Sequence, residues 1–129
     1  MSDPTIESVL RRYAEAWVVG DLTAIIDAYH DDFVLHYFGD SPLAGSHVGK
    51  DSALAALAEA TARTNRQLVE VVDVLAGTHL GALVVTERLG PDREFRRILL
   101  YRTEDAKLRE CWLYDENQPF IDHLWSTPA

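Results

Sequence analysis

The sequence predicts an α+β domain in which helices cover one face of a curved, mostly antiparallel sheet. The first observation is that apolar residues recur at helical spacing in the first half of the chain, over residues 6–29 and 51–63. The second is that the apolar period shortens to about two beyond residue 67, where β-branched and aromatic residues predominate. The length of 129 residues suits one domain, so we expect residues 1–129 to share a single core.

A helical hairpin is predicted at the N-terminus. Asp3 and Pro4 supply an N-cap and a proline at the first helical position, Gly20 supplies the stop, and Asp21 can cap the second helix. The apolar stripes of the two helices consist of Ile6, Val9, Leu10, Tyr13, Ala14 and Trp17, followed by Leu22, Ile25, Ile26 and Tyr29.

Five strands and a third helix follow. The first strand, Phe33–Phe38, leads through a loop rich in Gly, Ser and Pro to the third helix, Asp51–Arg63. The other strands are Leu68–Leu75, Leu80–Leu89, Phe95–Tyr101 and Leu108–Tyr114. Their short joints, Ala76–Thr78, Gly90–Asp92 and Glu104–Ala106, favour antiparallel hairpins. The tail, Pro119–Trp125, is expected to form a short helix or turn. Helices on the concave side of such a sheet would enclose a pocket.

Composition and charge exclude several classes of partner. The formal net charge is −9 and no basic run offsets it, so neither nucleic acid nor an anionic membrane surface is an expected partner. Cys111 is the single cysteine, which excludes an internal disulfide and favours a reducing compartment. The N-terminus lacks a secretory signal pattern, and no apolar run approaches the roughly 18 residues of a membrane span. We therefore expect a soluble, cytoplasmic domain.

Three stretches of the sequence carry a family resemblance: RRYAEAWVVGDLTAIIDAYHDDFVLHYFG, SPLAGSHVGKDSALAAL and RECWLYDENQ. The first joins an aromatic helix, a Gly-Asp break, a second helix ending in Asp-Asp, and a strand. The middle stretch is similar to a loop that leads into a third helix, and the last to a final Trp- or Tyr-rich strand followed by Asp. In this order they resemble the nuclear transport factor two-like superfamily, and within it ketosteroid isomerase and the SnoaL-like polyketide cyclases.

The resemblance covers nearly the whole chain and implies both a fold and an assembly. The implied fold is a cone-shaped α+β barrel, in which three helices from the N-terminal half close one deep apolar pocket. The implied assembly is a homodimer formed through the outer face of the sheet. The fold alone does not settle the chemistry, because it supports enzymes, binding proteins and assembly factors.

The catalytic groups of ketosteroid isomerase are only partly matched. Tyr13 stands at the place of the isomerase's oxyanion-binding tyrosine. Tyr37 occupies the place of its general base, and Leu99 lies near the place of its protonated aspartic acid, a carboxyl that its apolar site keeps neutral. Two of the three groups are therefore replaced, and ordinary ketosteroid isomerase chemistry is not expected.

The SnoaL-like cyclases imply a different acid or base, at the position of Asp115. Strand alternation places Leu99 and Tyr101 on one strand, and Leu113 and Asp115 on the next, on matching faces. A carboxyl facing an apolar cavity has a raised pKa, as a general acid or base near neutral pH requires. The alternative is that Asp115 ends its strand and bonds within the turn before Glu116.

Further polar candidates each have a structural alternative. His36 and Tyr37 are adjacent on a strand, so only one can face the pocket; the resemblance places Tyr37 inward, although His36 would be the better base. Tyr13 either packs in the core or offers its hydroxyl to a ligand. Arg97 shares a face with Leu99, so it needs a carboxylate partner or lies at the open rim.

The apolar candidates form a predicted ligand-binding wall: Trp17, Leu35, Leu57, Val84, Leu99, Tyr101, Cys111 and Leu113. Cys111 is expected to be a small core residue. No metal site is expected, because the histidines show no metal-ligand spacing. No cofactor is expected, because there is neither a Gly-rich phosphate loop nor a G-x-S-x-G elbow.

Two functions are consistent with these features. The first is a cofactor-independent proton-transfer enzyme (an isomerase, cyclase, dehydratase or epoxide hydrolase) acting on a small apolar oxygenated molecule. Asp115 would be its acid or base, and Tyr13 with Tyr37 or His36 would orient the substrate or stabilise an oxyanion. The second is a non-catalytic ligand-binding or dimeric interaction domain, which needs only the apolar wall.

Overall fold

The computed structural model describes residues 5–41, 44–89 and 93–126. The helices are α1 (Ile6–Val19), α2 (Leu22–Asp27), α3 (Lys50–Thr64) and α4 (Gln118–Ser126). The strands are β1 (Tyr29–Tyr37), β2 (Gly45–Val48), β3 (Gln67–Ala76), β4 (Gly81–Leu89), β5 (Arg93–Glu104) and β6 (Lys107–Asp115). The predicted α+β class is confirmed.

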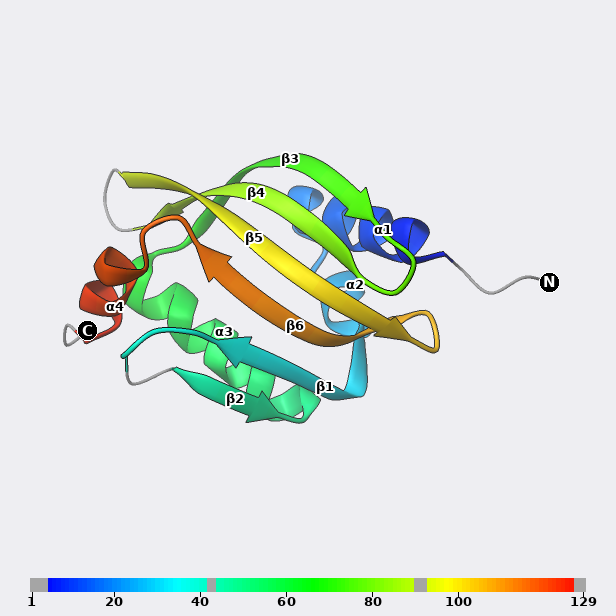
Figure 1. The fold of residues 1–129 in the computed structure, drawn as a ribbon, viewed down its shortest axis with the longest axis horizontal. Helices are drawn as coiled ribbons and strands as arrows, with labels where there is room; N and C mark the ends of the chain where they lie inside the picture. The colour runs from blue at the N-terminus through cyan, green and yellow to red at the C-terminus, as the bar shows by residue number, and fades with distance from the viewer. Residues whose placement is uncertain (1–4, 42–43, 90–92, 127–129) are drawn as a thin grey trace.

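All six strands form one sheet in the order β2-β1-β6-β5-β4-β3. The sheet is strongly curved but unclosed, with β2 and β3 at its edges (Figure 1). The predicted antiparallel hairpins from β3 to β6 are confirmed, and β1 joins β6 in parallel. The short strand β2, which pairs with β1, was not predicted, because it lies in a segment dominated by Gly and Ser.

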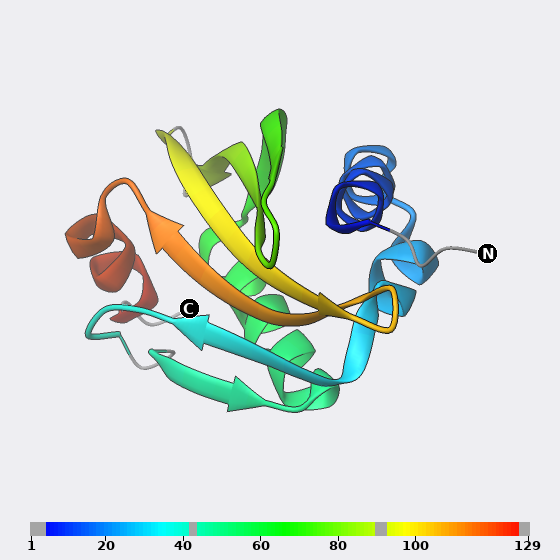
Figure 2. The same ribbon diagram turned by 45° about the vertical axis from the view of Figure 1, so that its right-hand side comes forward.

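The first three helices lie on the concave side of the sheet (Figure 2). Helix α1 packs on β3 and β4, whereas α3 packs on β1 and β2 at the other half. Helix α2 contacts α1 and β1. Helix α4 contacts α3 and β6 at the end of the sheet. This arrangement places the space between α1 and α3 directly over the inner face of the central strands.

Capping explains most helix boundaries. The Thr5 side chain accepts a hydrogen bond from the Ser8 N–H at 3.1 Å and caps α1, while the predicted cap at residues 3 and 4 lies outside the described residues. Gly20 ends α1 with a left-handed φ of 75°, and Asp21 caps α2 through the Ala24 N–H, both as predicted. Helix α2 is shorter than predicted.

Tyr29 corrects the predicted extent of the second helix. It begins β1 and pairs with Leu108 of β6 instead of ending the helix. The reason lies in the tertiary structure. Pairing with β6 gives the Tyr29 backbone hydrogen-bond partners on a neighbouring strand, and these would be lost if the helix continued by another turn. The β5–β6 joint is a two-residue turn, in which Asp105 and Ala106 have φ of 54° and 61°.

Strand alternation decides which residues enter the core. In the register of β5 and β6, Tyr101 faces Cys111, Leu99 faces Leu113 and Arg97 faces Asp115. The predicted matching faces are therefore confirmed. The charged side chains buried on the inner face include Glu87, Arg97 and Asp115, each of them 1% exposed.

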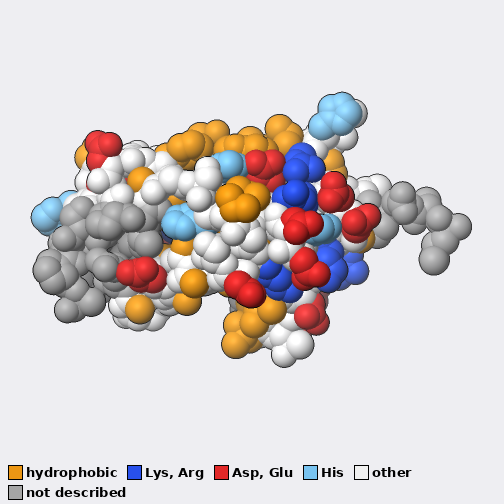
Figure 3. Space-filling model, turned by 90° about the horizontal axis from the view of Figure 1, so that it is seen from below, with side chains coloured by type: hydrophobic (Ala, Val, Ile, Leu, Met, Phe, Trp, Pro, Cys, Tyr) orange, Lys and Arg blue, Asp and Glu red, His pale blue; other side chains and the backbone are white. Residues whose placement is uncertain are grey.

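The surface mixes both signs of charge. On the face seen in Figure 3, acidic and basic side chains gather side by side rather than in separate patches, and hydrophobic side chains lie both along the margin and near the centre. None of the described helices has the length and apolar character needed to cross a membrane. The predicted joint at residues 90–92 lies outside the described residues.

Candidate functional site

Two adjoining spaces lie between the helices and the concave face of the sheet. The first, here called the inner cavity, has a volume of about 10 Å³, close to the room that one water molecule needs. It is lined by Tyr13, Trp17, Tyr29, Phe33, Leu35, Leu57, Arg66, Leu99, Tyr101, Cys111 and Leu113. Apart from the hydroxyls, the thiol, the indole and one guanidinium, its wall is apolar.

The second space, here called the outer groove, runs between α1–α2 and α3 and has a volume of about 410 Å³. It adds Leu22, Ile25, Ile26, Leu54, Ala58 and Thr61 to residues that also line the inner cavity. The shared residues are Tyr13, Trp17, Tyr29, Leu57 and Arg66. A volume of this order suits a small molecule, and the shared wall places the groove next to the inner cavity.

The structure brings most of the predicted wall together. Tyr13, Trp17, Leu35, Leu57, Leu99, Tyr101, Cys111 and Leu113 all line the inner cavity. Val84 does not, and its predicted place in the wall is wrong. It pairs with Ile98 on the outer face of the sheet, because its neighbours Leu83 and Val85 both take inward positions on β4.

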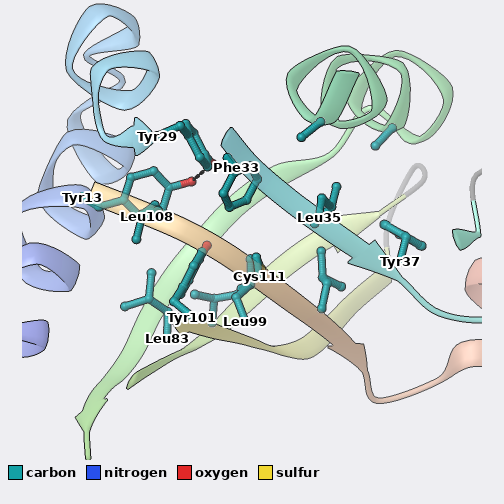
Figure 4. Close-up of a cluster of buried hydrophobic side chains, with 14 of the residues drawn as sticks. Tyr13, Tyr29, Phe33, Leu35, Tyr37, Leu83, Leu99, Tyr101, Leu108 and Cys111 are labelled. Carbon is teal, nitrogen blue, oxygen red and sulfur yellow. Dashed lines mark hydrogen bonds between the residues drawn. The ribbon is translucent and has the colours of Figure 1, made fainter. Parts of the chain in front are cut away.

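A cluster of phenols forms the polar end of the inner cavity (Figure 4). The hydroxyls of Tyr13 and Tyr29 share a hydrogen bond, and the Tyr101 hydroxyl points toward the same space. The rings pack edge to face, with centroids 5.5 Å apart for Tyr13 and Tyr29 and 6.0 Å apart for Tyr13 and Tyr101. The sequence identified Tyr13 and Tyr101 but assigned Tyr29 to a helix.

These phenols stay neutral at ordinary pH. Burial raises the pKa of Tyr13, and it raises the pKa of Tyr29 and Tyr101 well above the usual value. For Tyr13 this increase is partly opposed by its hydrogen bonds with Tyr29 and Tyr101. Either hydroxyl of the Tyr13–Tyr29 pair can be the donor. When Tyr29 donates, the Tyr13 proton is left for a carbonyl or enolate oxygen of a ligand.

Asp115 belongs to a buried ion cluster. Its Oδ1 is 2.5 Å from Arg97 Nε, and Arg97 Nη1 is 2.9 Å from Glu87 Oε2. Arg97 Nη2 donates to the Tyr37 hydroxyl at 2.9 Å. Of the two alternatives for Arg97, the buried residue with a carboxylate partner is correct and the open rim is wrong. Asp115 pairs with Arg97 across the strands, so it does not merely close a turn. Arg66 joins this cluster through Glu87, and it also lines the inner cavity.

The pKa values of this cluster follow from burial and pairing. Burial raises the pKa of Asp115, and the opposing effect of Arg97 does not fully offset it. Burial would lower the pKa of Arg97, but Glu87, then Tyr37 and Asp115, raise it, so this guanidinium remains charged. Burial also raises the pKa of Tyr37 to about 12. Asp115 itself is not among the residues that line the inner cavity.

His36 lies on the outer face of the sheet, which corrects its suggested catalytic role. Its Nε2 is 2.5 Å from Glu110 Oε2 and its Nδ1 is 2.8 Å from Ser46 Oγ. The ring stacks on Trp112 with centroids 5.3 Å apart. Tyr37 takes the inward position of β1 and is 3% exposed. The adjacent pair therefore divides between the two faces of the strand, as its alternation requires.

Sequence reasoning missed two charged residues near the cavity. Arg66 comes just after Asn65, the residue that caps the C-terminus of α3, and its Nε lies 3.3 Å from Glu87 Oε2. Arg66 Nη1 and Glu87 Oε1 are buried and have no hydrogen-bond partner among the described residues. Glu87 left a signal in the sequence, because it shares the inward face of its strand with Val85 and Leu89. Arg66 left none, since its position depends on how α3 ends.

One group of side chains has the closeness of a metal site: His30, Glu104 and Asp105. However, His30 Nδ1 accepts the Asp32 backbone N–H at 3.0 Å. This leaves the proton on Nε2, which faces the carboxylates of Glu104 and Asp105 at 3.5 and 3.4 Å. Such an arrangement fits hydrogen bonding from the Nε2–H group to the carboxylates better than metal coordination.

Comparison with known proteins shows a family and a fold. The model of the SnoaL-like domain family matches residues 10–111. A protein of unknown function with a cystatin-like fold from Xanthomonas campestris has a TM-score of 0.86 at 20% identity, covering 96% of this chain and 100% of that one. An NTF2-like protein from Burkholderia xenovorans LB400 has a TM-score of 0.73 at 18% identity, covering 96% and 99%.

A further similar structure carries the name of an enzyme class. A protein from Kribbella flavida, described as a ketosteroid isomerase by inference, has a TM-score of 0.68 at 16% identity, covering 86% of this chain and 77% of that one. No match is found among curated protein sequences. At identities this low, the similar structures show the fold and leave the substrate open.

Proposed function

The chain belongs to the SnoaL-like domain family, and from this premise we propose that it binds a small, mostly apolar, oxygenated molecule and acts on it by proton transfer without a cofactor. The outer groove and inner cavity would hold the apolar body of this molecule. Its oxygen would lie at the phenol cluster. The similar structure described as a ketosteroid isomerase is consistent with this class of reaction.

The observation that carries the proposal is the phenol cluster at the end of an apolar wall. Tyr13 is held by Tyr29 and is neutral, so it can donate a hydrogen bond to an oxygen that gains negative charge. A donor fixed in this way, away from water, stabilises a transition state by about 3 kcal/mol, or about two decades in rate. Such a site needs few other polar groups.

The proposed proton acceptor is Asp115, whose pKa is raised by burial. In the reaction, a proton would leave the carbon next to a carbonyl and pass to the Asp115 carboxylate. The electron pair of the broken C–H bond would move onto the carbonyl oxygen, which accepts the Tyr13 hydrogen bond. Return of the proton to the same or another carbon would complete exchange or isomerisation.

A second candidate is binding without chemistry, and a specific observation favours it. Arg97 holds both oxygens of Asp115, with the second contact at 3.3 Å. Asp115 is also absent from the lining of the inner cavity. A carboxylate held in this way would have to leave its partner before it could reach a substrate carbon.

One pair of compounds separates these candidates. The ketone 2-acetonaphthone and the hydrocarbon 2-ethylnaphthalene share a ring system, but only the ketone has an oxygen and exchangeable methyl protons. We expect tighter binding of the ketone and, in D₂O, faster incorporation of deuterium into its methyl group, measured by NMR. Tyr13→Phe should lower the exchange rate by about two decades. Tyr114→Phe, on the exposed outer face, is the matched control.

The outcomes divide as follows. Faster exchange that is lost in Tyr13→Phe and Asp115→Asn supports the enzyme. Binding of both compounds with no exchange supports the non-catalytic domain. Binding in the cavity is detected by NMR as chemical-shift changes at Leu99 and Leu113. If neither compound causes such changes, both proposals are wrong.

A further inference from the structure

Arg66 provides the charge at the junction of the inner cavity and the outer groove. Among the described residues that line these two spaces, it is the only charged one. Its guanidinium carbon lies 5.9 Å from the centroid of the Trp17 ring, so one face of the group rests against an aromatic wall. The side chain is 15% exposed.

The contacts of Arg66 leave hydrogen-bonding capacity unused. Its Nε approaches Glu87 Oε2, but that oxygen also accepts from Arg97 Nη1. Arg66 Nη1 is buried and has no partner among the described residues. Arg97, in contrast, uses all three of its nitrogens, on Asp115, Glu87 and Tyr37. The two guanidiniums are therefore not equivalent: every nitrogen of Arg97 has a partner, whereas Nη1 of Arg66 has none among the described residues.

A buried donor without a partner is unfavourable, and a buried guanidinium favours an anionic oxygen above a neutral one. Apolar residues of α2 and α3, including Ile25 and Leu54, flank Arg66 along the outer groove. That a ligand binds here is part of the proposed function, on which this inference rests. We propose that this ligand is an organic acid. Its carboxylate or enolate oxygen binds Arg66 Nη1, and its apolar body lies in the outer groove.

Two fluorescent compounds that differ by one anionic group test this inference. They are 1-anilinonaphthalene-8-sulfonate and N-phenyl-1-naphthylamine, which has the same rings without the sulfonate. We expect the wild-type protein to bind the sulfonate more tightly by roughly tenfold or more, because one charge-assisted hydrogen bond distinguishes them. Added salt should weaken binding of the sulfonate and leave the neutral compound unchanged.

Three substitutions locate the effect. Arg66→Gln should remove the preference for the sulfonate and change the affinity for the neutral compound less than twofold. Arg88→Gln makes the same change of charge at an exposed ion pair and should preserve the preference. Arg12→Gln tests a separate hollow of about 390 Å³ that Arg12 lines, and should also preserve it.

Folding is controlled within the same series. Glu87 keeps Arg97 as a partner in Arg66→Gln, so the variant should retain a native near-ultraviolet circular dichroism spectrum. Arg66→Lys keeps the charge without the planar group and should restore part of the preference.

Each remaining outcome overturns something specific. If the wild-type protein binds both compounds equally, the inference is wrong and the proposed function stands. If the folded Arg66→Gln variant loses affinity for both compounds equally, Arg66 acts only by packing and the inference is also wrong. If neither compound binds the wild-type protein, the proposed function fails together with the inference.

Discussion

Arg97 and Asp115 lie directly opposite each other on β5 and β6, and the guanidinium contacts both carboxylate oxygens, at 2.5 and 3.3 Å. Both side chains are 1% exposed. The same guanidinium binds Glu87, and Arg66 approaches Glu87 from the other side. Two cations and two carboxylates therefore share one buried cluster, and each member depends on the others for its partner.

Removal of Arg97 should be strongly destabilising. Arg97→Met leaves the carboxylates of Glu87 and Asp115 buried and short of one cation. The free energy of unfolding should fall by about 3–5 kcal/mol at neutral pH, measured by urea denaturation. The loss should be smaller at acidic pH, because the carboxyl groups then take up protons. Arg88→Met, which breaks an exposed pair with Glu94, should change stability by about 0.5 kcal/mol at most.

The Asp115 carboxyl should titrate above its ordinary pKa of 3.8. Because the folded state then binds this proton more tightly than the unfolded state does, stability should fall as pH rises from 3.8 through the raised value. Carbon-detected NMR measures the titration, and Asp115→Asn assigns it and should remove that part of the pH dependence of stability. A pKa at or below 3.8 would mean that Arg97 outweighs burial.

The protein should form a homodimer through the outer face of the sheet. Ile98 and Tyr114 are 42% and 46% exposed on adjacent strands, and Phe38 is 38% exposed and stacks on Tyr114. Light scattering should give twice the chain mass of 14.5 kDa. Ile98→Glu should halve that mass by placing a charge in the apolar contact. A monomeric mass for the wild-type protein would contradict the prediction.

Cys111 should be unreactive in the folded protein. Burial raises the pKa of its thiol to about 12, and the residue is 2% exposed. Alkylation by iodoacetamide, followed by mass spectrometry, should be roughly a hundredfold slower in buffer than in urea, because the thiol must first become exposed. Rapid labelling under native conditions would show that the inner cavity opens readily.

The order of the helices and strands followed from local patterns. Period, capping residues and short joints predicted the N-terminal hairpin and the antiparallel strands β3 to β6 with nearly correct ranges. Strand β2 escaped prediction because its four residues carry no apolar alternation. Tyr29 was assigned to a helix because its spacing continued the apolar stripe, whereas pairing with β6 drew it into β1.

The sequence predicted the residues of the candidate site only where the alternation of strand residues between the two faces of the sheet was enough to place them. Leu99, Tyr101, Cys111 and Leu113 were placed on one face because strand residues alternate without exception between bulges. Val84 was assigned to the wrong face of its own strand. The same alternation separated His36 from Tyr37, but it could not say which of the two faced inward.

By itself the sequence determined the α+β class, the helical hairpin, the antiparallel strands and the pairing of inner-face residues between β5 and β6. These depend on contacts between neighbours in the chain or across short hairpins. Only the tertiary structure decided that Arg97 would hold Asp115, that Arg66 would reach the cavity, and that Tyr29 would meet Tyr13. The geometry of these side-chain contacts depends on the curvature of the sheet and on the packing of α1 and α3 upon it, which no local sequence pattern records.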